Sequence, residues 1–172
     1  AEQPFDGIIS IGAFEHFARP DMDRAAKIAA YSRFFRFCHD SLVDGGHVSL
    51  QTISWMNARP DQESDNQQAD FFPESNLPHV TEVVQAADPW FHVMEMHNRP
   101  RDYALTLREW LRRLKANRQA LEAEYGSDTV QRYKRAFTAY ALGFEYQVTG
   151  LCRFVLRKRG GTDRIDRNPL RA

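Results

Sequence analysis

A carboxylate and an imidazole stand side by side shortly after an apolar run near the start of the chain. The run covers residues 5–12 (FDGIISIG) and is followed closely by Glu15 and His16. Ligands of open α/β sheets bind beyond the carboxyl ends of the strands. If residues 5–12 form such a strand, Glu15 is a candidate catalytic carboxylate and His16 a candidate base. The alternative is that both side chains serve only packing and hydrogen bonding.

Metal chemistry has no support in the sequence. Four histidines later in the chain lack metal-like spacing with carboxylates: His47, His79, His92 and His97. Cys38 and Cys152 lie in unrelated segments and form no ligand motif. We therefore expect no metal site and no disulfide framework, and the default compartment is the reducing cytoplasm.

The first fifty residues read as a β-α-β unit. The apolar run over 5–12 suits a parallel strand that is buried on both faces. Asp21 or Asp23 can cap a helix that continues to about Leu42. A second strand is expected over 47–53, so the sheet should be parallel with a right-handed crossover.

The rest of the chain mixes helices with two further strands. A helix is expected over 80–87 and a strand over 90–97. A strongly amphipathic helix should follow over 102–125, then an aromatic-rich helix over 130–148 and a last strand over 150–158. The polar stretches are expected to be a long surface loop, 57–78, and a disordered tail, 159–172.

No glycine-rich cofactor loop follows any of these strands. Gly45-Gly46 comes before a strand, so it is interpreted as a helix stop. A doubly wound fold carries its cofactor loop after its first strand, and this sequence opens almost directly on a strand pattern. We therefore expect residues 1–158 to be the C-terminal portion of a larger domain whose cofactor-loop half is absent.

Composition limits the partners. Lysine plus arginine balances aspartate plus glutamate, 23 against 23, which removes the main argument for a nucleic-acid partner. No apolar run approaches the ~20 residues of a membrane-spanning helix. The helix over 102–125 carries basic residues mostly off its apolar stripe: Arg108, Arg112, Arg113, Lys115 and Arg118. That face would suit peripheral contact with an anionic membrane at the inner surface, and its alternative is a merely solvated face.

Three pieces of the chain together carry a family resemblance. They are residues 9–17 (ISIGAFEHF), residues 46–53 (GHVSLQTI), and a series of short matches from 72 onward that ends in YALTLREW at 103–110. In order and spacing they resemble the C-terminal part of cyclopropane-fatty-acyl-phospholipid synthases and mycolic acid cyclopropane synthases. The first piece is the most specific, and related plant amine N-methyltransferases share its FEH segment.

The resemblance implies a fold and a cofactor. The fold is a seven-stranded, Rossmann-like class I methyltransferase with a helical insertion before the last strand. The strands over 5–12 and 47–53 would be its fourth and fifth, and the last two a reversed hairpin at the sheet edge. The cofactor would be S-adenosylmethionine, with Ser10, Ile11 and Gly12 beside it.

The resemblance also implies a reaction. Family members add a methyl group to an alkene and hold a bicarbonate ion as the base that removes a proton. Glu15 and Tyr103 match two ligands of that ion. Gln51 stands where the family pattern has a histidine; its amide can hydrogen-bond the ion but cannot titrate near neutrality. This departure leaves open whether the chain supports ring formation.

Several functions therefore remain. The leading one is methyl transfer to an unsaturated acyl lipid, giving a cyclopropane or a methyl branch. A methyltransferase for a small amine, with His16 as base, and a non-catalytic fragment or subunit are the alternatives. The aromatic residues of the helix over 130–148 can form core or line an acyl-chain pocket. A homo-oligomer is compatible with the sequence.

Overall fold

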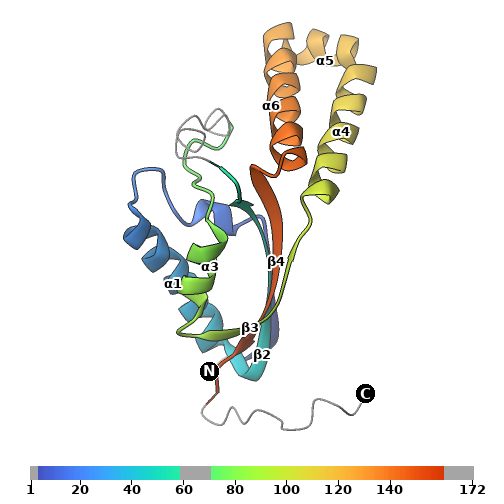
Figure 1. Cartoon of the computed structure of the whole chain (residues 1–172). Coiled ribbons are helices and arrows are strands. Elements are labelled where there is room, and N and C mark those ends of the chain that lie inside the picture. The colour runs from blue at the N-terminus through green and yellow to red at the C-terminus, as the bar shows by residue number, and fades with distance from the viewer. Residues whose placement is uncertain (1–3, 59–70, 161–172) are drawn as a thin grey trace.

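A four-stranded sheet in the order β1-β2-β4-β3 is the frame of the molecule (Figure 1). The computed structural model describes residues 4–58 and 71–160. β1 (Phe5–Ile11) and β2 (Leu42–Trp55) are parallel, as predicted. β4 (Thr149–Lys158) is antiparallel both to β2 and to the edge strand β3 (Phe91–Asn98), so the predicted reversed hairpin is confirmed.

Helix α1 (Arg24–Ser41) begins and ends close to where the sequence predicts. Asp23 is its N-cap, and the Asp23 carboxylate accepts a hydrogen bond of 2.8 Å from the Ala26 amide. Its buried residues recur every three to four positions, which turns one side of the helix toward the sheet. The short helix α3 (Val80–Ala87) packs beside α1 on the same side of the sheet (Figure 1).

The main core lies between these two helices and the sheet. Phe14, at the start of the 3-10 turn η1 (Phe14–His16), stacks on Tyr31 of α1 with ring centroids 4.4 Å apart. Phe35, Phe91 and Phe154 complete the aromatic part of this core, and each is at most 1% exposed. The core therefore fixes η1, which follows β1, against the helix that crosses the sheet.

Strand β1 is not buried on both faces, contrary to the prediction. Phe5, Ile9 and Ile11 are 59%, 76% and 65% exposed, whereas Ser10 is buried. Only β2 pairs with β1 in the described part of the chain, and no described helix covers the face on which Ile9 and Ile11 lie. An apolar strand pattern indicates that the side chains are suited to burial, but burial also requires another part of the protein to pack on them.

The helical insertion before β4 contains three helices where two were predicted. These are α4 (Pro100–Ala116), α5 (Arg118–Tyr125) and α6 (Ser127–Glu145), and they stand beyond one end of the sheet (Figure 1). The expected single helix over 102–125 breaks at Asn117, where the backbone leaves the helical conformation with φ of −104° and ψ of 14°. The Asn117 side-chain amide donates to the Arg113 carbonyl in the last turn of α4. Gly126, with φ of +82°, starts the turn into α6.

Two of the expected segments fall largely outside the described residues. These are the surface loop over 57–78, of which residues 59–70 are not described, and the tail over 159–172, of which only residues 159 and 160 are described. No helix in the described ranges combines the length and the apolar character that crossing a membrane requires.

Candidate functional site

A cavity of about 370 Å³ lies between the end of the sheet and the helical insertion. Its polar end is formed by Gly12, Glu15 and His16, which follow β1. Its apolar wall comes mainly from aromatic residues of α4 and α6: Tyr103, Trp110, Tyr133, Phe137, Tyr140 and Phe144. A polar group beside an apolar cavity is the usual composition of a small-molecule site.

Glu15 is held rigidly in this cavity. The side chain is 5% exposed, and its Oε1 accepts a hydrogen bond of 2.6 Å from the Ile53 amide of β2. Its Oε2 is buried and has no hydrogen-bond partner in the described structure. A buried carboxylate oxygen without a donor is costly, so the contacts within the described residues leave this atom's hydrogen bonding unaccounted for.

Tyr103 faces the same cavity from the first turns of α4. Its ring packs against Phe144, with centroids 5.0 Å apart. Burial, and secondarily the charge of Glu15, raises the pKa of the Tyr103 phenol above its usual value. The hydroxyl therefore stays protonated at neutral pH and can donate a hydrogen bond.

His16 lines the cavity, and its ring lies edge-on to Phe72 with centroids 5.6 Å apart. The His16 side chain is exposed, in contrast to its neighbour Glu15. The structure thus brings three of the predicted catalytic side chains, Glu15, Tyr103 and His16, to one cavity.

Gln51 is not among the residues that line the cavity. Its Oε1 accepts a hydrogen bond of 2.8 Å from Nε of Arg153, its direct neighbour on β4. Arg153 in turn lies 3.9 Å from the carboxylate of Asp102, at the start of α4. The catalytic role expected for Gln51 stays a prediction.

The three residues expected beside the cofactor differ in exposure. Ser10 is buried, Ile11 is 65% exposed, and Gly12 lines the cavity. Gly12 has φ of +64°, and a Cβ added to it would meet no atom within 4 Å. The carboxyl end of β1 therefore has an open surface, where the exposed Ile11 side chain lies next to Gly12.

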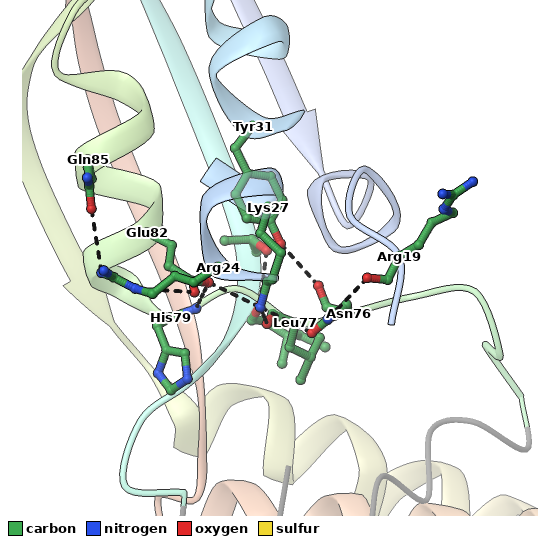
Figure 2. Close-up of polar contacts among 11 residues, drawn as sticks. Arg19, Arg24, Lys27, Tyr31, Asn76, Leu77, His79, Glu82 and Gln85 are labelled. Atoms are coloured by element: carbon green, nitrogen blue, oxygen red, sulfur yellow. Dashed lines mark hydrogen bonds and ion pairs between the residues drawn. The ribbon is translucent and has the colours of Figure 1, made fainter. Parts of the chain in front are cut away.

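A buried lysine supports the site and was not predicted (Figure 2). Nζ of Lys27 lies 3.2 Å from Oε2 of Glu82 and 3.1 Å from the Leu77 carbonyl, to which it donates. It also donates to Oδ1 of Asn76 at 3.2 Å. The Asn76 amide donates to the backbone carbonyl of Glu15 at 3.1 Å, so this network connects α1 and α3 to η1, the turn that carries Glu15.

Glu82 and Tyr31 complete this network. Glu82 is 3% exposed, and its Oε2 also accepts from the His79 amide at the start of α3. The Tyr31 hydroxyl donates to the Asn76 carbonyl at 3.1 Å. Burial, followed by the charges of Glu82 and Glu15, raises the pKa of Tyr31 above its usual range. Lys27 precedes Tyr31 by one helical turn, and that spacing could have indicated a buried lysine.

Four of the five basic residues expected to face a membrane from α4 and α5 are paired with carboxylates. Arg108 makes a bidentate contact with Glu145 of α6, at 2.8 and 2.6 Å. Arg112 and Arg113 both bind Glu109, and their hydrogen bonds lower the pKa of that carboxyl to about 2. Arg118 pairs with Glu122 in the same way. The expected membrane contact through this face stays a prediction. The paired carboxylates lower the net positive charge of the face.

No group of three or more His, Cys, Asp or Glu side chains in the described ranges is arranged to hold a metal ion.

The family model for mycolic acid cyclopropane synthetase matches residues 1–154. The chain belongs to this family. The resemblance inferred from the three sequence pieces is therefore confirmed.

Individual members of the family agree with this assignment. The chain is 30% identical over 170 residues to cyclopropane mycolic acid synthase 2 of Mycobacterium leprae, covering 91% of this chain and 54% of that protein. It is 30% identical over 146 residues to the cyclopropane-fatty-acyl-phospholipid synthase of Escherichia coli K12, covering 79% of this chain and 32% of that protein. The chain thus spans about half the length, or less, of these relatives.

Solved structures of other proteins share the fold. The mycolic acid cyclopropane synthase CmaA1, complexed with SAH and CTAB, superimposes with a TM-score of 0.76 at 26% identity, over 92% of this chain and 57% of that one. Coclaurine N-methyltransferase, at 20% identity and a TM-score of 0.66 over 92% of this chain and 49% of its own, shows the fold alone. The predicted class I methyltransferase fold is confirmed.

Proposed function

We propose that this chain provides the acceptor-side part of an S-adenosylmethionine-dependent methyltransferase that acts on an unsaturated acyl chain. The product would be a cyclopropane or a methyl-branched lipid. The observation that carries the proposal is the buried Glu15 carboxylate, with one oxygen unpaired, at the polar end of an aromatic cavity. The synthases to which the chain is similar are named for products of this kind.

The cavity walls suit a hydrocarbon chain. Tyr103, Leu107 and Trp110 of α4 line it together with Phe137 and Phe144 of α6, and the rings pack in pairs, Tyr103 on Phe144 and Trp110 on Phe137. An acyl chain laid against this wall would bury apolar area at about 25 cal/mol per Å². Aromatic walls also keep water away from a carbon centre that becomes positively charged during the reaction.

Glu15 and Tyr103 are proposed to hold the base. Oε2 of Glu15 needs a hydrogen-bond donor, and the Tyr103 hydroxyl can supply one to an acceptor. A bicarbonate-type ion satisfies both, because it carries one O–H and further acceptor oxygens. Held between these groups, such an ion lies beside the acyl chain and can take up the proton that ring closure releases.

The cofactor would lie at the open end of β1. Ile11 gives an apolar contact, and Gly12 leaves space for the close approach of a ligand to the backbone. When bound, S-adenosylmethionine supplies an electrophilic methyl group to the acceptor. The residues of this chain would orient the acceptor, exclude water and hold the base.

The test uses the product of the complete reading frame with methyl-labelled S-adenosylmethionine and vesicles of monounsaturated phospholipid. We expect label in the lipid, with a mass gain of one methylene for a ring. Glu15→Gln should lower the rate by about two to three orders of magnitude, as loss of a directly positioned electrostatic group does. Glu95→Gln, an exposed carboxylate on β3, is the matched control and should be near wild type.

Two results would count against the proposal. One is label that enters amines but no lipid, which would favour the small-amine alternative with His16 as base. The other is a Glu15→Gln enzyme that turns over at the wild-type rate, since the base could not then depend on that carboxylate.

A further inference from the structure

An open groove of about 580 Å³ lies along α6, next to the aromatic cavity. Phe71 lines both the groove and the cavity. The Phe71 ring packs on Tyr133 of α6, with centroids 4.7 Å apart. The two spaces therefore adjoin, and this aromatic ring separates them.

The groove is strongly cationic. Arg132, Lys134 and Arg135 line it, and no Asp or Glu is among its described lining residues. The guanidinium carbon of Arg132 lies 5.1 Å from the centroid of the Phe71 ring, within range of a cation–π contact. Arg132 thus stands where the groove meets the cavity.

The basic residues of α4 present a different surface. Arg108, Arg112 and Arg113 are engaged by Glu145 and Glu109 at 2.6 to 2.8 Å. Two carboxylates compensate most of the charge of these three arginines, and an anion would have to compete with a carboxylate to reach any of them. The groove on α6 is therefore the better anion site in the insertion, although the sequence pattern had pointed to α4.

We propose that this groove binds the phosphate headgroup of the acceptor lipid, while the acyl chain passes Phe71 into the aromatic cavity. The inference rests on the proposed function, because it takes the acceptor to be an acyl lipid. Arginine suits this role, since its planar fork of donors matches phosphate oxygens. The occupant is a phospholipid rather than an acidic protein, because the cationic groove adjoins an apolar cavity across one ring, as a headgroup adjoins its acyl chain.

The size of the groove agrees with this occupant. Its volume lies within the range of about 300 to 1,000 Å³ that small-molecule sites occupy. Gln131 and Thr138 add neutral polar groups to its lining. A headgroup held there would anchor one end of the lipid and so limit which carbons of the chain reach Glu15.

The experiment measures lipid binding without the cofactor. Arg132→Gln with Arg135→Gln removes two charges from the groove, and Arg112→Gln with Arg113→Gln removes two from α4 as the matched control. Partition onto phosphatidylglycerol vesicles should fall about 25-fold for the groove variant, at about fivefold for each basic residue near an anionic surface. The α4 variant should lose much less, because the proposed headgroup contact is on α6 and not on α4.

A second arm separates the groove from general attraction to a charged membrane. A short-chain phosphatidylglycerol, used below its micelle concentration, should bind the wild-type protein and lose most of its affinity in the groove variant. Thermal unfolding of both variants should stay close to wild type, since all four substituted arginines are exposed. An equal loss of lipid binding in both variants, or unchanged short-chain binding in the groove variant, would overturn the proposal.

Failure of this inference differs from failure of the proposed function. If the groove is wrong but the function right, the groove variant methylates phospholipid with unchanged KM and kcat. If the function is wrong but the groove right, lipid binding still depends on Arg132 and Arg135 while no lipid is methylated. Weakened binding to an acidic carrier protein, with vesicle binding intact, would also reject the lipid headgroup.

Discussion

Replacing Lys27 with methionine tests whether the buried ion pair holds the site together. Methionine has nearly the length of lysine, so the change removes the charge and leaves little cavity. Glu82 would keep its charge at 3% exposure, with only Arg24, 3.8 Å away and itself 61% exposed, to offset it. Breaking a buried pair from one side typically costs about 3 to 5 kcal/mol.

The structure places the expected cost near the lower end of that range. Arg24 can turn toward Glu82 and compensate part of the charge. Against this, the Leu77 carbonyl and Oδ1 of Asn76 also lose their donor, which adds to the loss. We expect Lys27→Met to lower the free energy of unfolding by about 3 kcal/mol. With an m-value of about 2 kcal/mol/M, the urea midpoint would move by roughly 1.5 M.

Urea unfolding followed by fluorescence measures this change, and two further variants control it. Arg112→Met breaks an exposed pair, with side chains 68% and 40% accessible, and should cost less than about 1 kcal/mol. Lys27→Met combined with Glu82→Gln leaves no unpaired charge and should be more stable than Lys27→Met alone. The reasoning is refuted if Lys27→Met costs no more than Arg112→Met, or if the double variant is the least stable of all.

Two other predictions concern single residues. Burial raises the pKa of Cys38 to about 11. Iodoacetamide at pH 8 should therefore alkylate Cys38 in the native protein at least about a hundredfold more slowly than in the unfolded chain. Fast alkylation of the native protein would contradict this prediction. Because the unfolded state loses the thiol proton first, the stability that this thiol contributes is complete below about pH 8.5 and is lost as the pH rises to about 11. Gly12→Ala should lower stability by about 1 to 2 kcal/mol through its positive φ alone, since the added Cβ has open space around it. Denaturation curves would disprove this if the alanine variant were as stable as wild type.

Local sequence patterns predicted much of the fold because the forces behind them are local. The Asp23 cap and the apolar spacing of α1 act within a few residues of one another, and both are found. The break at Asn117 was missed because an asparagine amid good helix formers is only a weak stop. The pairing of Arg112 and Arg113 with Glu109 lies at helical spacing and could have been foreseen.

The contacts that define the candidate site are long-range, and here the sequence could say less. Lys27 meets Asn76 49 residues further along, and Gln51 meets Arg153 across 102 residues. Family resemblance pointed to Glu15 and Tyr103, and the fold brings both to one cavity. It could not indicate that the amide oxygen of Gln51 is taken up by an arginine, because this contact depends on how β2 and β4 are paired.

The cavity joins two parts of the chain that can change independently. Glu15 is anchored by the Ile53 amide of the sheet, whereas most of the apolar wall belongs to α4 and α6. Substitutions in those two helices can lengthen, narrow or bend the space for an acceptor without moving the carboxylate. Under the proposed function, divergence within this fold can alter which molecule is modified while Glu15 keeps its position, so the helical insertion is the natural place to engineer a new acceptor.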